Sequence, residues 1–107
     1  MTQIFVGDSP MTLINTFTVD PAKADALVDL LNEATEAVMR HQPGFVSANI
    51  HKALDGRHVA NYAQWQSRAA FEAMQADPVA REHMKKAAAL AEGFEPVVYA
   101  VSAVHEA

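Results

Sequence analysis

Apolar and polar residues alternate along several short segments bounded by Gly and Pro, which is the pattern of strands with one buried face. In the first of these segments Leu13, Asn15 and Phe17 share one face, and β-branched residues occupy the other. The pattern predicts four strands, over Met11–Val19, Phe45–Leu54, Val59–Trp65 and Val97–Val104.

Between the strands, apolar residues recur at helical spacing behind clear start signals. Asp20-Pro21 and Asp77-Pro78 each place a capping side chain before a proline, and Ser67 precedes a third apolar repeat. Such side chains accept hydrogen bonds from first-turn N–H groups, and proline suits the first helical position. We expect Pro43-Gly44 to end the first helix and Gly93 to end the last.

The resulting order, β-α-β-β-α(α)-β, is typical of the ferredoxin-like α+β fold, in which an antiparallel sheet carries its helices on one face. We expect one such domain over residues 11–107. Gly7, Asp8, Ser9 and Pro10 separate it from a short apolar start, so residues 1–10 are interpreted as an N-terminal extension.

A hairpin with Asp55-Gly56 as a two-residue turn sets the register of the middle strands. It pairs Ile50 with Asn61 and Val46 with Trp65, on an apolar face that the helices should cover. The opposite face mixes polar and apolar side chains in a way that suits neither a core nor open solvent. A second copy packed there would account for it, so we predict a homodimer. The mixed face consists of Phe45, Ser47, Asn49, His51, Tyr62 and Gln64.

Asn61 is the unusual residue of the apolar face, because a carboxamide among Val, Ile and Ala costs free energy unless it is hydrogen-bonded. Trp65 follows four residues later and therefore lies on the same strand face. The two side chains could line one wall of an apolar pocket with hydrogen-bond donors. They could equally be a core Asn bonded to the backbone and a core Trp that fills space.

Composition narrows the choice of function. The chain has 107 residues, a net charge of −5 and no cysteine, which excludes thiolate chemistry, disulfides and Cys–zinc sites and argues against nucleic-acid binding. The five histidines are scattered, so no metal site is predicted, and no Gly-rich phosphate loop is present. No apolar run is long enough for a membrane span or a signal peptide, which indicates a cytoplasmic protein.

Three runs, PGFVSANIHKALDG, RHVANYAQWQSRAAFEAM and ADPVAREHM, resemble the antibiotic biosynthesis monooxygenase (ABM) domain, and the resemblance extends from Met11 to about Val104. It implies a dimeric α+β barrel of ferredoxin-like domains. It also implies a cofactor-independent monooxygenase that oxidises a small phenolic, quinol or polyketide-type aromatic with O₂.

By this resemblance Asn61 and Trp65 bind substrate oxygens. The helix position where anthrone oxygenases carry a Tyr holds Phe71, which has no hydroxyl. Lys85, or Arg81, corresponds to an assisting basic residue. His51 corresponds to a strand histidine near the pocket, although the hairpin register directs it away from Asn61.

A haem-degrading branch of the family uses a strand Asn, a helix Trp and a helix His. Asn15 fits the first position, but Met74 occupies the second and Met84 the third, with His83 one residue off. Haem degradation is therefore disfavoured. The resemblance to the aromatic oxygenases instead implies that Asn15, Phe71, Met74 and Arg81 bind the substrate. The alternatives on the same scaffold are a non-redox polyketide cyclase or isomerase, and a domain that binds an aromatic ligand without chemistry.

Overall fold

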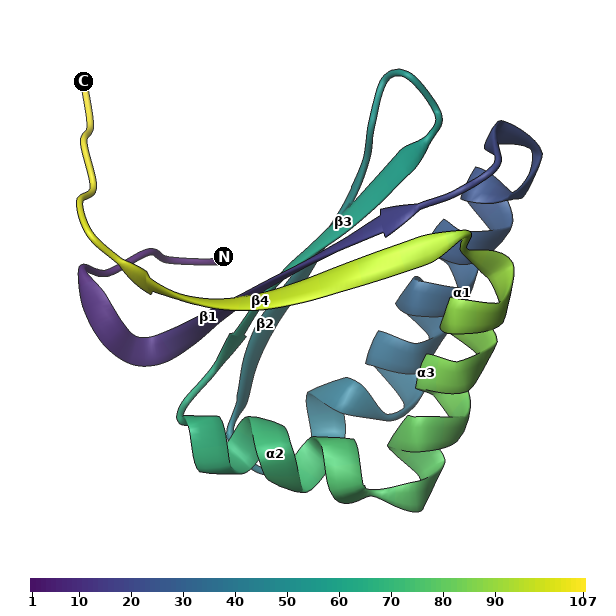
Figure 1. The fold of residues 1–107 in the computed structure, drawn as a ribbon. Coiled ribbons are helices and arrows are strands. Elements are labelled where there is room, and N and C mark those ends of the chain that lie inside the picture. Colours follow the sequence, from purple (N-terminus) through teal and green to yellow (C-terminus); the bar gives the residue numbers. More distant parts are fainter.

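The computed structural model describes residues 1–107 and has the predicted element order (Figure 1). Four antiparallel strands form one sheet in the order β2-β3-β1-β4, which is the ferredoxin-like topology, and the helices lie on one face of it. None of the helices has the length and apolar character needed to cross a bilayer. The elements are β1 (Gly7–Thr18), η1 (Pro21–Lys23), α1 (Ala24–Ala37), η2 (Met39–His41), β2 (Phe45–Lys52), β3 (His58–Trp65), α2 (Arg68–Ala76), α3 (Pro78–Leu90) and β4 (Gly93–Val101).

The three predicted caps are confirmed, and they explain where the helical segments begin. The carboxylate of Asp20 accepts the N–H of Ala22, at 2.8 Å, and starts η1, which continues into α1. Ser67 accepts the N–H of Ala70 at the start of α2. Asp77 caps α3 in the same way, with its oxygen 2.9 Å from the nitrogen of Ala80. Each bond satisfies a first-turn N–H group that has no partner inside the helix.

Strands β1 and β4 differ from the prediction at their ends. β1 begins at Gly7 rather than Met11, because Gly7 already pairs with Val101 of β4 ahead of an irregularity in the register. β4 begins at Gly93, ends at Val101 and includes Pro96, whereas Gly93 was expected to end α3. A proline is tolerated here because β4 is an edge strand that pairs only with β1, and its missing N–H can face outward.

The hairpin of β2 and β3 has the predicted register, with Ile50 opposite Asn61. Its turn is longer than the predicted two residues. The N–H of Ala53 donates to the carbonyl of His58 at 2.9 Å, so residues 54–57 form a four-residue loop. The longer loop adds one residue on each side, which leaves the register unchanged.

Asp55 organises this loop. One of its carboxylate oxygens accepts the backbone N–H of Arg57 at 2.7 Å, and the other lies 3.1 Å from Nδ1 of His58. The bond from Arg57, with a smaller contribution from His58, lowers the pKa of Asp55 below its ordinary value. A lowered pKa in the folded state means that this contribution to stability is present at neutral pH. It is lost as the pH falls through the folded-state pKa.

A bulge in β2 corrects the predicted pairing of Val46 with Trp65. The register shifts so that Phe45 lies opposite Trp65 and Ser47 opposite Gln64, which leaves Val46 unpaired and 45% exposed. Phe45 thereby moves to the helix-covered face, where its ring stands edge-on to the indole of Trp65 at 5.5 Å between centroids. The bulge therefore replaces a valine with an aromatic ring beside Trp65.

The core consists of two apolar clusters rather than one. One lies towards α2 and contains Met11, Leu13, Ala63, Trp65, Phe71, Met74 and Ala80. The other lies towards the start of α1 and contains Phe17, Val19, Ala24, Leu27, Val59 and Ala87. Along β1 and β3 the two clusters are separated by one pair of residues, Asn15 and Asn61, which lie opposite each other.

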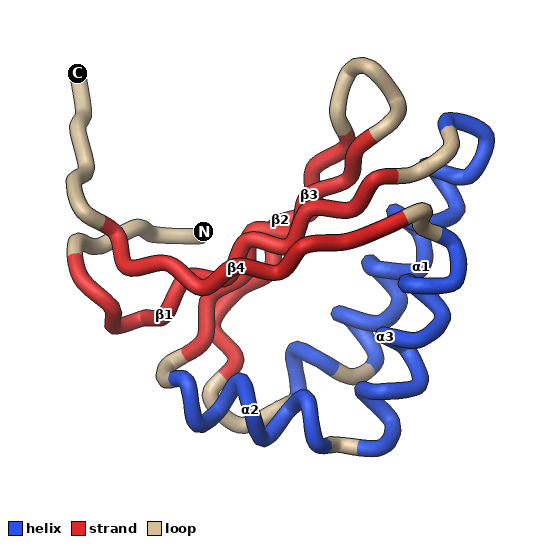
Figure 2. Tube along the Cα trace, viewed as in Figure 1, coloured by secondary structure: helices blue, strands red, loops and turns tan.

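The residues ahead of β1, called here the N-terminal arm, lie on the sheet face opposite the helices, called here the open face (Figure 2). There the amide of Gln64 donates to the carbonyl of Gln3 at 2.7 Å and accepts the hydroxyl of Ser47 at 2.6 Å. The hydroxyl of Thr2 donates to Asn49 at 2.7 Å. These polar groups were expected to pair across a dimer interface, but they find partners within their own chain.

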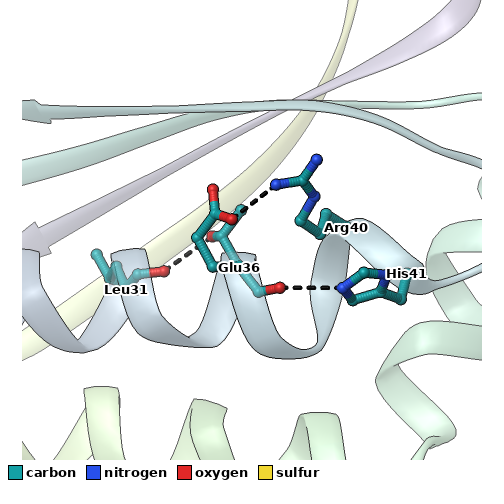
Figure 3. A network of polar contacts seen from close by, with 5 residues as sticks. Leu31, Glu36, Arg40 and His41 are labelled. Atoms are coloured by element: carbon teal, nitrogen blue, oxygen red, sulfur yellow. Dashed lines mark hydrogen bonds and ion pairs between the residues drawn. The ribbon is translucent and has the colours of Figure 1, made fainter.

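The end of α1 is held by local polar contacts (Figure 3). Arg40 forms an ion pair with Glu36 at 2.6 Å, and the ring N–H of His41 donates to the carbonyl of Glu36 at 3.1 Å. The hydroxyl of Thr35, the residue before Glu36, donates to the carbonyl of Leu31 one turn earlier at 2.8 Å. The exposed ion pair contributes little energy, but together these bonds direct the chain through η2 towards β2.

We predict that replacing Gly44 with Ala destabilises the protein by about 2–4 kcal/mol. Gly44 has a φ of +83°, which disfavours any side chain, and an added Cβ would collide with the Cβ of Ala70 on α2. Chemical denaturation measures the effect. Gly93→Ala is the matched control, because nothing lies near its Cβ position and its φ is ordinary. Equal stability of the two variants would contradict the role given to Gly44.

Candidate active site

A cavity of about 180 Å³ lies between the sheet and the helices, where the two core clusters meet. Its wall combines residues of β1, β2 and β3 with residues of all three α-helices, and most of them are apolar. It reaches the surface beside β4 and α2, where Phe94, Pro96 and Gln75 are exposed wall residues. A concave, mostly apolar cavity with a few polar groups is the usual form of a small-molecule site.

The carboxamides of Asn15 and Asn61 form the polar part of the sheet wall. The two residues are direct partners in the β1–β3 ladder, so their side chains stand next to each other on the helix-covered face. The Oδ1 atom of each is buried and has no hydrogen-bond partner within the protein. A buried acceptor without a partner costs roughly 1–3 kcal/mol, which favours a ligand that supplies the missing hydrogen bond.

Trp65 and α2 form the aromatic end of the cavity. Trp65 is 3% exposed and lies between the rings of Phe45 and Phe71, at centroid distances of 5.5 and 6.2 Å. Phe71 and Met74 are buried on the inner side of α2 and also line the cavity. The structure thus brings Asn15, Asn61, Trp65, Phe71 and Met74 together, as the sequence predicted.

His83 also lines the cavity, although the sequence predicted no site role for it. It belongs to the face of α3 that carries the buried residues Ala80 and Ala87, which are three residues before it and four after it. Its Nδ1 is buried without a hydrogen-bond partner. The signal that could have found it is the helical period, which places position 83 on the same stripe as these two alanines.

Three predicted site residues do not reach the cavity. Arg81 and Lys85 are exposed, because each lies about 100° around α3 from the stripe of Ala80 and Met84. His51 is exposed on the open face, where its Nδ1 lies 3.0 Å from the carbonyl oxygen of Asn49. The predicted orientation of His51 away from Asn61 is confirmed. His51 pairs with Ala60, the residue before Asn61, and neighbouring residues of a strand point to opposite faces.

The wall holds no charged residue that could fix a metal or an anionic cofactor, and no group of three or more His, Cys, Asp or Glu side chains occurs anywhere in the chain. What the site offers is a set of neutral hydrogen-bonding groups around an apolar space. Such a set can orient a flat molecule with a few oxygen substituents and stabilise negative charge that develops on them.

Residues 10–89 match the family model of the antibiotic biosynthesis monooxygenases, so the chain belongs to this family. It is 53% identical over 80 residues to the tetracenomycin-F1 monooxygenase of Streptomyces glaucescens, covering 73% of this chain and 71% of that protein.

Solved structures agree with this membership. A monooxygenase from the gene ActVA-Orf6 of Streptomyces coelicolor, in complex with the ligand nanaomycin D, superposes with a TM-score of 0.84 at 32% identity, over 92% of this chain and 93% of that one. The protein PA3566 of Pseudomonas aeruginosa has a TM-score of 0.75 at 26% identity, over 89% and 96% of the two chains. The fold of this chain is therefore the fold of these proteins.

Proposed function

We propose that the protein is a monooxygenase that oxidises a phenolic or quinol-like ring of a polyketide-type aromatic with O₂, without a metal or organic cofactor. The observation that carries the proposal is the pair of partnerless carboxamides, Asn15 and Asn61, beside Trp65 in an otherwise apolar cavity. The relatives support the substrate class, since one is named for tetracenomycin F1 and the other was solved with nanaomycin D.

The chemistry balances without another electron source, because the substrate is the reductant. Loss of a proton from an anthrone-type methylene gives an anion that passes one electron to O₂. The radical and the superoxide combine to a hydroperoxide, which loses water and leaves a carbonyl. The net change converts CH₂ and O₂ into C=O and H₂O. The protein then has to bind the ring, stabilise the developing oxyanion and exclude bulk water.

Each wall residue has a place in this scheme. The NH₂ group of Asn61 and the indole N–H of Trp65 are donors for the substrate oxygen on which negative charge develops, whereas the partnerless Oδ1 atoms of Asn15 and Asn61 accept from substrate hydroxyl groups. Asn15, opposite Asn61, is positioned to bind a neighbouring oxygen substituent of the same ring system. Phe71 and Met74 pack against the ring from α2. Phe71 contributes no hydroxyl, so the phenolic donor that the resemblance implies at this position is absent.

The size of the cavity limits how much of the substrate it encloses. An enclosed apolar volume of about 150 Å³ accommodates benzene, and this cavity measures about 180 Å³. It therefore suits one or two rings. The remainder of a larger polycycle would extend past the exposed residues Phe94 and Pro96 beside β4.

We also propose that the protein is a homodimer that associates through the open face and the N-terminal arm. Exposed apolar side chains remain on this side after the polar groups have found partners in their own chain. They are Ile4, Phe5, Val6, Val46 and Tyr99, and exposed groups of this kind favour a protein partner.

The first prediction concerns cofactors. Protein treated with chelator and freed of flavin and haem should oxidise an anthrone such as dithranol faster than autoxidation, with O₂ uptake equal to carbonyl formed. An oxygen electrode and quinone absorbance measure both quantities. Activity that returns only on adding iron, haem or flavin would refute the cofactor-free proposal. Anaerobic turnover of the substrate would instead favour the cyclase or isomerase.

The second prediction concerns the donors. Asn61→Ala should lower kcat by roughly 10²–10³, because it removes a donor to the developing oxyanion. Trp65→Phe should also lower kcat and change KM less, because it retains an aromatic ring and loses only the N–H. Asn32→Ala, at an exposed position of α1 outside the cavity wall, is the matched control and should retain the wild-type rate. Wild-type kinetics in both wall variants would make Asn61 and Trp65 ordinary core residues.

The third prediction concerns assembly. Light scattering at micromolar concentration should give twice the 11.6 kDa mass of the chain. Phe5→Asp and Tyr99→Asp should lower the dimer's stability by placing a charge in the interface, whereas Val79→Asp should not, because Val79 is exposed on α3. A wild-type mass of 11.6 kDa at every concentration would exclude the dimer.

A further inference from the structure

The reaction proposed above needs a group that accepts the substrate's proton, and the cavity wall restricts the choice to one side chain. The wall contains no Asp, Glu, Lys, Arg, Tyr or Cys, and His83 is its single residue whose type titrates near neutral pH. The basic residues expected from the sequence, Arg81 and Lys85, lie outside the wall. His51 lies on the open face of the sheet.

The hydroxyl groups of the wall are already committed. The hydroxyl of Thr35 donates to the carbonyl of Leu31, and that of Ser47 donates to Gln64. Their acceptors are a backbone carbonyl and an amide oxygen, and neither is a base that could take the hydroxyl proton. The two hydroxyl groups are therefore not activated to accept a proton from the substrate. Neutral carboxamides, such as those of Asn15 and Asn61, are too weakly basic for this role.

His83 is different because the protein leaves its ring nitrogen without a partner. Nδ1 is buried, and no carboxylate, carbonyl or hydroxyl of the chain bonds to it. His83 lies on α3 between Ala80 and Ala87, which are both buried, so this part of the helix backbone packs against the core. Because His83 lines the cavity, a molecule bound there is the available source of a hydrogen-bond partner for the ring, as for Asn15 and Asn61 on the opposite wall.

We propose that the imidazole of His83 is the catalytic base that takes the proton from the bound aromatic, an inference that rests on the proposed function. The proton moves from the substrate to a ring nitrogen of His83 and leaves an anion whose charge spreads onto the oxygen held by Asn61 and Trp65. After the anion has reacted with O₂, the imidazolium returns the proton to the peroxide oxygen. Water then leaves, and His83 is neutral again.

The deciding experiment measures proton removal separately from oxygenation. In D₂O without O₂, wild-type protein should accelerate exchange of the methylene protons of anthrone, followed by NMR. His83→Ala and His83→Gln should lose this acceleration and lower aerobic kcat by roughly 10²–10⁴. Quenching of Trp65, the single tryptophan, should show similar binding of anthrone to all variants. His105→Ala removes an exposed histidine near the C-terminus and is the matched control.

Chemical rescue distinguishes a base from a residue that only supports the fold. Added imidazole should restore proton exchange in His83→Ala, and a phenol already ionised at the assay pH should react at similar rates in wild type and variant. Exchange in both His83 variants at the wild-type rate would overturn the proposal. The proposal would also be overturned if imidazole did not restore proton exchange in His83→Ala and this variant also oxidised the ionised phenol more slowly than the wild type. If proton exchange depended on His83 but the protein did not oxygenate the substrate in air, the proposed function would be refuted. The role of His83 as a base would still stand.

Discussion

The pairing of Asn15 with Asn61 is the constraint around which the site is built. These residues stand opposite each other on the two central strands, in the middle of a sheet face that is otherwise apolar. Apolar packing cannot continue across two carboxamides without leaving them unsatisfied, and the core divides into one cluster on either side of the pair. The cavity occupies the place where the two clusters would otherwise meet, so the polar pair and the space beside it are a single structural feature.

The bulge at Val46 determines what faces this pair from the edge of the sheet. A regular β2 strand would place valine against Trp65 and turn Phe45 to the open face. The bulge brings Phe45 to the indole edge-on and leaves Trp65 between two phenyl rings. Aromatic contacts of this geometry add about 0.5–1.5 kcal/mol beyond burial of area, and they fix the plane of the indole. The direction of its N–H therefore depends on a backbone irregularity at Val46, directly before the register becomes regular at Ser47.

Local signals in the sequence were sufficient for the element order, the three caps and the hairpin register, because each depends on residues a few positions apart. They correctly placed Asn61, Trp65, Phe71 and Met74 around one cavity. Other features depend on tertiary context. The bulge has no local signature, Gly7 and Gly93 belong to strands because β1 and β4 pair beyond the expected ends, and the N-terminal arm docks on Gln64 from more than sixty positions away. The expectation that Lys85 or Arg81 assists at the pocket took no account of the period of α3, which places each of them about 100° from the buried stripe of that helix.

Most buried polar side chains of the open face have partners within the chain, with Thr12 Oγ1 as the exception, whereas the polar atoms buried around the cavity lack partners. On the open face Gln64 is 2% exposed, yet its amide is bonded on both sides, to Ser47 and to the arm. On the helix-covered face Asn15, Asn61 and His83 contribute three of the four buried side-chain polar atoms that lack a partner. The N-terminal arm supplies a partner for the buried amide of Gln64, so the chain can satisfy a buried polar group of the sheet. The three groups around the cavity nevertheless have no partner within the chain. Since unpartnered groups reduce stability and these three surround one cavity, the cost is best explained by a ligand that completes them.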